Sequence, residues 1–201
     1  MIEIKCEQGT EEWFDLKIGI PSASNFNKIV TTTGIPSKQQ EKYLYQLAGE
    51  TITGKREEGL SSKAMEQGVI REAEARDLYQ MLNDVDVRQT GVCYKDENKD
   101  FLCSPDGLIG EDGMLEIKCP LIHTHVSYLL KNALPSDYYC QVHGQMYVTG
   151  RKYCDFMSYY PGLPSLIIRV YRGEEFIKKL EVELNVFAIK LKEIVKVLKS
   201  K

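Results

Sequence analysis

The residues best suited to chemistry lie in the stretch CSPDGLIGEDGMLEIKCP, which occupies positions 103–120. Positions 111–113 form an acidic turn signal, so the chain after Asp106 is expected to double back as a hairpin that runs as far as Lys118. Asp106 and Glu116 then become neighbours on paired strands. Because side chains alternate along a strand, Glu116 and Lys118 are expected to project to one face of the sheet. Three charged groups would therefore converge there.

The chemistry of such a group centres on a divalent cation. Two carboxylates and the main-chain carbonyl of Ile117 offer hard oxygen ligands, which suit Mg²⁺ or Mn²⁺. Beside such an ion, Lys118 could orient or deprotonate a water molecule for in-line attack on a phosphodiester. The residues thus favour metal-assisted phosphodiester hydrolysis. Spacing alone also allows an ordinary hairpin, because Pro-Asp-Gly is a common turn string and Glu-x-Lys on a strand is commonly a solvated charge pair.

The rest of the chain must supply the elements that hold this hairpin. Hydrophobic spacing and turn signals predict strands over residues 2–5, 85–94, 101–109, 114–118, 152–160 and 166–171. Short helices are expected after Thr10 and from Ser22 or Ser24, and longer ones over 37–53, 62–82, 124–132, 136–148 and 174–198. This order predicts an α/β fold with a central mixed β-sheet flanked by α-helices, in one domain that spans residues 1–201.

Composition and charge narrow the class of protein. The chain has 43% hydrophobic and 27% charged residues, which is ordinary for a soluble globular protein. Its first residues carry charges where a secretory signal needs an apolar run, and no stretch approaches the roughly 18 apolar residues of a membrane span. We therefore expect a cytoplasmic protein with no membrane contact. The net charge of −3 exerts no general attraction on nucleic acid, so DNA binding would need a local basic surface or bound metal ions.

The cysteines and histidines form no metal-binding motif. None of the six cysteines pairs with another in a C-x-x-C spacing, so free buried thiols are the favoured interpretation and a zinc ribbon is not expected. The three histidines lack an acidic partner in a ligand spacing, and they are interpreted as surface or capping residues: His123, His125 and His143.

Four segments in order resemble the phage lambda exonuclease family, the YqaJ-type viral recombinases of the PD-(D/E)XK nuclease superfamily. Pro105, Asp106, Glu116 and Lys118 match the P-D…(D/E)-x-K signature. The other matching segments are EQGTEEWFDLKIGIPSAS at 7–24, GVIREAEAR at 68–76 and QVHGQMYVTGRK at 141–152. The resemblance spans most of the chain and implies a restriction-endonuclease-like core.

The resemblance also implies roles for individual residues. Asp106 and Glu116, with the Ile117 carbonyl, would bind Mg²⁺, for which Mn²⁺ could substitute. Lys118 would activate water. Glu72 would be the family's additional acidic residue near the site, although from its spacing alone it is one glutamate among several on a charged helix.

Further roles carried over from the family concern the substrate. Gln141 would position the reacting phosphate or water, and Lys17, Ser24 and Ser104 would bind a 5′ phosphate. Serine hydroxyls at a helix start and a cation together suit an anion. Lys17 stands where the family often has arginine, so a bidentate grip on the phosphate becomes a point-charge contact. Met65 takes the place of an apolar residue that wedges the strands apart, and a core role for Met65 is equally open.

The family's activity is a 5′-to-3′ exonuclease that degrades one strand of linear double-stranded DNA, prefers a 5′-phosphate end and leaves 3′ single-stranded overhangs for recombination by annealing. By that resemblance we expect a homotrimer ring and a single-strand annealing protein as partner, in a bacterial or phage-infected bacterial cell. The alternatives are an endonuclease of the same fold, a non-catalytic DNA-binding module, or a Cas4-like exonuclease. The last would need an iron–sulfur cluster held by Cys6, Cys93, Cys119 and Cys154.

Overall fold

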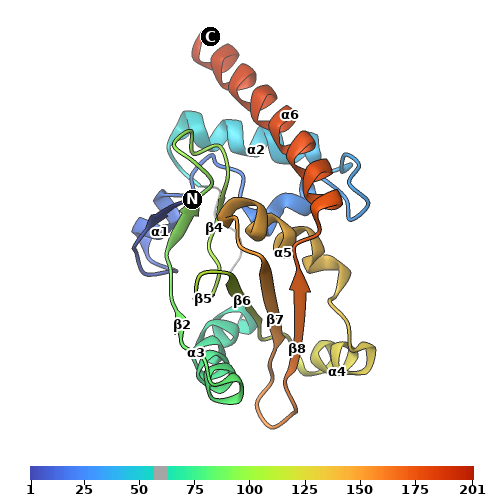
Figure 1. The fold of residues 1–201 in the computed structure, drawn as a ribbon. Coiled ribbons are helices and arrows are strands. Elements are labelled where there is room, and N and C mark those ends of the chain that lie inside the picture. Colours follow the sequence, from blue (N-terminus) through green and yellow to red (C-terminus); the bar gives the residue numbers. More distant parts are fainter. Residues whose placement is uncertain (57–62) are drawn as a thin grey trace.

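The strands of this computed structural model form two sheets (Figure 1). The structure describes residues 1–56 and 63–201, with side chains over 1–56, at 68 and over 70–201. A five-stranded sheet has the order β2-β5-β6-β7-β8, and a smaller sheet has the order β1-β3-β4. The strands are β1 (Ile2–Ile4), β2 (Val87–Arg88), β3 (Val92–Tyr94), β4 (Leu102–Cys103), β5 (Gly107–Ile109), β6 (Gly113–Lys118), β7 (Tyr153–Ser158) and β8 (Leu166–Tyr171).

Strand β6 is the middle strand of the larger sheet and connects its two kinds of pairing. It pairs antiparallel with β5 through the expected hairpin, and parallel with β7. Because parallel strands cannot be joined by a tight turn, the chain between them makes a crossover through two helices. These are α4 (Ile122–Lys131) and α5 (Ser136–Thr149). The crossover brings α5 into contact with β7 and places two of its side chains within hydrogen-bonding distance of β6.

The remaining helices begin and end close to the predicted positions. Thr10 caps the first one by accepting a hydrogen bond from the Trp13 N–H at 3.4 Å, and Gly54 ends the α2 helix at a φ of +63°, which favours glycine. No helix within the described ranges is long and apolar enough to cross a membrane. These helices are α1 (Glu11–Asp15), the 3₁₀ helix η1 (Ala23–Lys28), α2 (Gln40–Thr53), α3 (Lys63–Asn83) and α6 (Glu174–Lys199).

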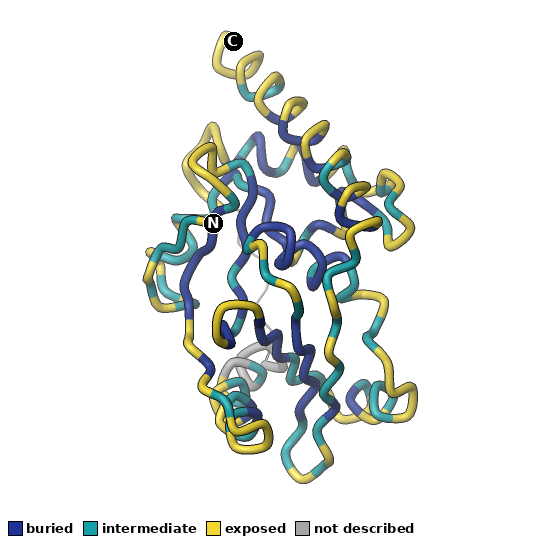
Figure 2. The backbone as a smooth tube through the Cα atoms, in the orientation of Figure 1, coloured by how far each residue is buried: buried dark blue, intermediate teal, exposed yellow. Residues whose placement is uncertain are grey.

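Helices cover both faces of the larger sheet. On one face, buried residues such as Leu108 and Met114 pack into a cluster with side chains from η1, α2, α5 and α6. On the other face, Leu115 and Ile117 pack with Ala75 and others from α3. Figure 2 shows β6 and β7 as the buried centre of the larger sheet and much of the outer surface of the helices as exposed. The predicted α/β fold with a helix-flanked mixed sheet is therefore confirmed.

Two predicted strands are wrong in extent. The stretches 85–94 and 101–109 each break in two, and their halves belong to different sheets. At the first break, a Cβ on Gly91 would lie 2.6 Å from the Ile4 carbonyl oxygen, so only glycine lets β1 come this close. At the second break, Pro105 has no N–H to donate to a neighbouring strand, so the hydrogen bonds of the sheet are interrupted there. Alternation of residues indicates strand character but not the sheet to which a strand belongs.

The interpretation of the histidines as surface residues is wrong for two of the three. His125 is fully buried, and its ring nitrogens lie 2.8 Å from the Ser158 hydroxyl and 3.0 Å from the Pro164 carbonyl. His143 is also buried, and its Nδ1 has no hydrogen-bond partner among the described residues.

The six cysteines are free. Cys93 and Cys103 face each other across the β3–β4 pair, and within residues 1–56 and 63–201 no group of three or more His, Cys, Asp or Glu side chains is arranged to hold a metal ion. The four-cysteine cluster that a Cas4-like protein would need is thus not formed by Cys6, Cys93, Cys119 and Cys154.

Candidate active site

The β5–β6 hairpin brings the acidic residues of the signature together. Gly107 pairs with Leu115, and one step further along this register Asp106 lies opposite Glu116. The Asp106 carboxylate accepts a hydrogen bond of 2.6 Å from the Ile117 N–H, which ties the residue before β5 to the middle of β6. Ile117 itself points into the α3-side core, as strand alternation predicts for the neighbour of Glu116 and Lys118.

Glu116 forms the floor of the site, and three donors surround its carboxylate. Its side chain is only 2% exposed, whereas that of Lys118 is 28% exposed. Oε1 lies 2.5 Å from the Lys118 ammonium and accepts a hydrogen bond of 2.6 Å from Gln141. Oε2 accepts a hydrogen bond of 2.5 Å from Gln145. Gln141 and Gln145 lie one turn apart on α5, so the crossover helix holds this carboxylate from above the sheet.

Helix α3 brings a second pair of charges to the same region. The Arg76 guanidinium lies 2.5 Å from the Glu72 carboxylate and also donates a hydrogen bond of 3.1 Å to the main-chain carbonyl of Asp106. Arg76 thus connects the α3 helix to the β5–β6 hairpin. Glu72 retains 31% exposure, so its carboxylate lies at the open side of the site.

The site carries an excess of negative charge. Burial raises the pKa of the Asp106 carboxyl well above its ordinary value, and the charges of Glu116 and Glu72 raise it further. Burial also raises the pKa of Glu72. Burial alone would lower the pKa of Lys118, but the charges of Glu116 and Asp106 outweigh it, so that pKa lies above its ordinary value. The neighbouring cations therefore do not fully offset the repulsion among these carboxylates and the cost of burying them.

These residues fit a hard divalent cation. Asp106 and Glu116 contribute carboxylates and Ile117 a main-chain carbonyl, all oxygen donors of the kind that Mg²⁺ and Mn²⁺ prefer. Because the described residues offer no third Cys, His, Asp or Glu in metal-binding geometry, water or a substrate phosphate would complete the coordination. A bound cation would also offset the mutual repulsion that raises the pKa of Asp106.

A hollow of about 440 Å³ lies beside this site and is lined by several basic side chains. Lys17 and Ser24, both expected at a 5′ phosphate, line it. So do two cations that the sequence did not single out, Lys28 and Arg56. Among the described residues its one lining carboxylate is that of Glu50, which already accepts hydrogen bonds from the Gly19 N–H at 3.2 Å and the Gln46 amide at 2.9 Å. We call this the Lys17 hollow.

The surroundings of Lys17 in this hollow disfavour its charged form. Burial, followed by the charge of Arg56, lowers the pKa of Lys17 to about 7. Its ammonium lies 3.3 Å from the centroid of the Trp13 ring, which supplies part of the lost solvation. An anion bound here would favour the charged form of Lys17 and raise its pKa again.

Ser104 lies next to the Lys17 hollow without lining it. Its hydroxyl accepts a hydrogen bond of 3.1 Å from the Trp13 indole N–H, and Trp13 is a wall of the hollow. Ser104 precedes Asp106 by two residues. The hydrogen bond between Trp13 and Ser104 therefore links the wall of the hollow to the carboxylates. The side chain of Met65, the expected wedge, lies outside the described residues.

Sequence reasoning missed four polar residues of these two sites. Gln145 and Arg76 each lie four residues after an expected site residue on a predicted helix, Gln141 and Glu72, and helical periodicity places such pairs on one face. That signal could have found them. Lys28 and Arg56 come from separate elements with no spacing between them that indicates proximity, so only the tertiary fold reveals them.

The fold and the site together define a class of protein. The nuclease signature requires that a strand after Pro-Asp pairs with a strand that carries Glu-x-Lys. In this chain β5 and β6 pair in that way, in the middle of a helix-flanked mixed sheet. The chain belongs to the family of the YqaJ-like viral recombinase domain, whose sequence model matches residues 12–152. That match includes both strands of the hairpin and the two glutamines of α5.

Solved structures agree with this assignment. The chain is 31% identical to an alkaline exonuclease from Laribacter hongkongensis over 95% of this chain and 97% of that one, with a TM-score of 0.87. A structure of the same exonuclease in complex with dAMP gives a TM-score of 0.86. A phage-related exonuclease from Haemophilus somnus 129PT, 14% identical over 89% of this chain and 96% of that one, has the same fold with a TM-score of 0.71. No curated protein matches the sequence. The chain is therefore a nuclease of the exonuclease-like recombinase family.

Proposed function

We propose that this nuclease is a 5′-to-3′ exonuclease that degrades one strand of linear double-stranded DNA. The observation that carries the proposal is the juxtaposition of two sites. A carboxylate cluster suited to phosphodiester hydrolysis adjoins the cationic Lys17 hollow, and the Trp13–Ser104 hydrogen bond joins them. An enzyme that starts from a 5′-phosphorylated end needs both a place for the terminal phosphate and a reactive centre one nucleotide away.

Asp106, Glu116 and the Ile117 carbonyl would hold Mg²⁺, or Mn²⁺ in its place. The bound ion would supply a more acidic water and stabilise charge on the attacking and leaving oxygens. Lys118, at the open edge of Glu116, would orient the attacking water. Gln141 would hold Glu116 and, at the edge of the site, the reacting phosphate. Glu72 would add negative charge on the solvent side.

The preference for a 5′ phosphate would come from the Lys17 hollow. Lys17 is a half-buried cation near a second cation, and Ser24 lines the same hollow. A phosphate there would relieve the repulsion between the cations, whereas a 5′ hydroxyl would not. Ser104, held by Trp13, would contact the phosphate from the side of the carboxylates. Met65 would separate the strands ahead of the site.

The products would be nucleoside monophosphates and a 3′ single-stranded overhang. The similar exonuclease solved with dAMP supports a mononucleotide product. The overhang would pass to a single-strand annealing protein. We propose a homotrimer ring that encloses the duplex. Exposed apolar residues on α6, among them Val182, Val186 and Ile189, offer surface that contact between copies would cover.

The deciding experiment incubates the protein with Mg²⁺ and three DNA substrates: a linear duplex with 5′ phosphates, the same duplex with 5′ hydroxyls, and a closed circle. We expect mononucleotide release from the linear duplexes, faster with the phosphate, and no release after EDTA removes the metal. Glu116→Gln serves as the inactive control. Rapid cutting of the closed circle would reject an exonuclease in favour of an endonuclease.

The same assay tests the Lys17 hollow. Lys17→Ala should raise the KM for the phosphorylated duplex and remove most of its advantage over the hydroxyl duplex. The matched control is Lys38→Ala, because Lys38 is an exposed lysine outside the hollow. An unchanged phosphate preference in Lys17→Ala would remove Lys17 from recognition of the 5′ end.

A further inference from the structure

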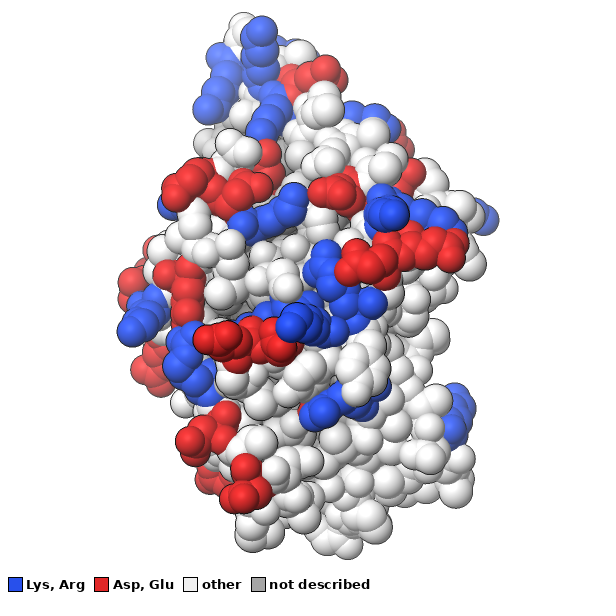
Figure 3. Space-filling view, viewed as in Figure 1, with Lys and Arg blue, Asp and Glu red and all other residues white. Residues whose placement is uncertain are grey.

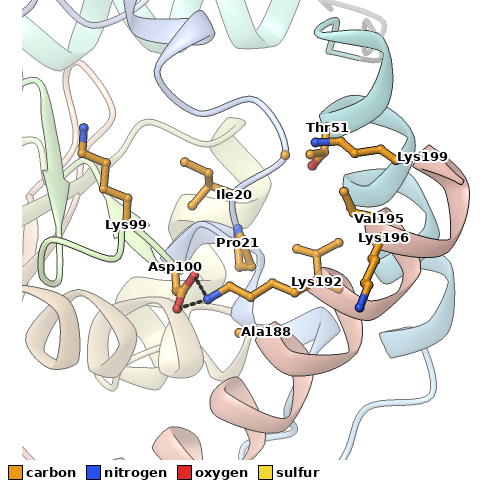
Figure 4. A pocket seen from close by; sticks show the side chains of 12 residues that line it. Ile20, Pro21, Thr51, Lys99, Asp100, Ala188, Lys192, Val195, Lys196 and Lys199 are labelled. Carbon is orange, nitrogen blue, oxygen red and sulfur yellow. Dashed lines mark hydrogen bonds and ion pairs between the residues drawn. The ribbon is translucent and has the colours of Figure 1, made fainter.

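Another hollow, of about 410 Å³, lies between the C-terminal half of α6 and the loop before η1 (Figure 4). No described residue of the candidate active site lines it, and of the residues known to line the Lys17 hollow it shares Ile20 alone. We call it the α6 hollow. Its volume is within the usual range of about 300–1,000 Å³ for ligand sites, and neither the carboxylate chemistry nor the recognition of a 5′ phosphate uses it.

The floor of the α6 hollow is aliphatic. Unpaired bases bind most favourably on aromatic rings, and none of the lining side chains that the structure describes is aromatic. An aliphatic floor suits the side chain of a leucine or phenylalanine, which gains from leaving water. The floor consists of Ile20, Pro21, Ala188, Leu191 and Val195.

Lysines surround this floor, and two of them already have partners. The Lys192 ammonium lies 2.7 Å from the carboxylate of Asp100, which is the only acidic residue that lines the hollow within residues 1–56 and 70–201. The Lys99 ammonium lies 5.1 Å from the centre of the Tyr94 ring. These two cations are thus partly satisfied within the chain.

The other two lysines that line the hollow have no such partner among the described residues. In the part of the chain that the structure describes, the α6 lysines that form salt bridges are Lys179, with Glu175, and Lys192, with Asp100, so Lys196 and Lys199 have no carboxylate partner there. In Figure 4 Lys199 reaches toward Thr51 at one end of the hollow, while the Lys192–Asp100 pair closes the other end. Figure 3 shows the basic side chains that gather at the C-terminal end of α6. A positively charged rim around an apolar floor is complementary to a ligand with the opposite charge and an apolar centre.

We propose that the α6 hollow binds an acidic segment of a partner protein, with an apolar side chain on the floor and flanking carboxylates on Lys196 and Lys199. The apolar contact would give affinity, and the lysines would give the preference for acidic flanks. Since Ile20 also lines the Lys17 hollow, the bound segment would lie on the outer side of the wall that forms the 5′-end site. The partner would thus be held next to the place where DNA enters, without blocking it.

The test uses the full-length protein and a short fluorescein-labelled peptide in which Leu-Phe is flanked by glutamates, with binding followed by fluorescence anisotropy. Two comparison peptides replace Leu-Phe by Ser-Ser or the glutamates by lysines. We expect binding of the first peptide only. The double variant Lys196→Glu with Lys199→Glu should weaken that binding by about tenfold or more. Lys190→Glu is the matched control, because Lys190 is exposed on the same helix but does not line the hollow.

A second variant separates the apolar contact from charge. Val195→Lys removes part of the floor while adding a cation, so a purely electrostatic site would bind the peptide more tightly and the proposed site less tightly. Nuclease activity on linear duplex, which none of these residues supports directly, shows that each variant is folded.

Three results would overturn the proposal. The first is equal peptide binding by the wild type and the Lys196→Glu, Lys199→Glu double variant. The second is tighter binding of a labelled single-stranded oligonucleotide that the same double variant abolishes, which would assign the hollow to nucleic acid. The third is a change in assembly mass in the double variant, which would assign the hollow to a second copy of this chain.

Discussion

At the scale of single residues, Glu116 organises the candidate site. A carboxylate that is 2% exposed is stable inside a protein only when its oxygens are paired, and here Lys118, Gln141 and Gln145 provide the partners. The two glutamines are neutral donors, so they satisfy Glu116 without cancelling its charge. The carboxylate therefore remains available to a cation on its open side.

Lys118→Ala should lower turnover by about 10²–10⁴-fold, the usual loss when a positioned proton-transfer group is removed. The variant should still bind duplex DNA, because the Lys17 hollow is intact. Mononucleotide release measures turnover, and an electrophoretic shift measured with Ca²⁺ in place of Mg²⁺ reports DNA binding. Full turnover in Lys118→Ala would exclude this lysine from the reaction.

Gln145→Leu tests whether the second glutamine positions Glu116. With its Oε2 partner lost, Glu116 is less well oriented toward a cation, and loss of such outer partners typically costs about 10–100-fold in metal affinity. We expect a higher Mg²⁺ concentration for half-maximal activity, with maximal turnover changed less. Direct Mn²⁺ titration by calorimetry provides a readout independent of activity. An identical Mg²⁺ dependence in wild type and variant would show that Gln145 only fills space.

At the scale of elements, helix α5 serves both the site and the core. Gln141 and Gln145 face Glu116, while His143, between them in sequence, packs against Tyr139 and Phe176 with ring centroids 4.4 Å and 5.3 Å away. One side of α5 thus contacts the carboxylate of the site, and another side packs against aromatic residues. Any loss of packing around His143 would be felt at Glu116.

Burial lowers the pKa of His143 to about 4, and the charge of Arg172 contributes. In the unfolded chain this histidine titrates near 6.5, so between those values the unfolded state binds more protons than the folded state. The free energy of unfolding should therefore fall as pH decreases from about 6.5 to 4, by at most about 3 kcal/mol from this residue.

Urea unfolding at several pH values would measure this effect. His143→Leu, which removes the titrating ring, should show a shallower decrease than the wild type over that pH window. His123→Leu is the control, because His123 is exposed. Parallel curves for the wild type and His143→Leu would contradict the assignment.

At the scale of the whole molecule, a chain with a negative net charge has to bind DNA, which is also negatively charged. The net charge is −3, yet Lys17, Lys28 and Arg56 lie together in the Lys17 hollow. Enclosure of the duplex by several copies would bring the basic groups of each copy to the same substrate. Local concentration of charge, not the total, would then set the attraction for phosphate.

The proposed trimer has a direct signature. Light scattering coupled to size-exclusion chromatography should give about 69 kDa, three times the chain mass of 23.0 kDa. Val186→Glu with Ile189→Glu, which places charges on the exposed apolar stripe of α6, should reduce that mass because a buried unpaired charge is costly at an interface. A monomer mass for the wild type at micromolar concentration would contradict the ring.

The sequence by itself determined the hairpin and the meeting of its charged residues. Turn residues and strand alternation act over a few positions, so they place Asp106, Glu116 and Lys118 on one face without reference to the rest of the chain. Helices with strong periodicity and caps are local in the same sense, and most of their boundaries agree with the structure to within a few residues. The resemblance to a nuclease family rests on these same local segments.

Only the tertiary structure decided which sheet each strand joins and which side chains meet from distant segments. The stretches 85–94 and 101–109 divide between two sheets because Gly91 lets β1 approach and Pro105 interrupts the ladder. The burial of His143, the cations of the Lys17 hollow and the α6 hollow all arise where separate elements pack together. Such contacts depend on the packing of whole surfaces, which no spacing along the chain encodes.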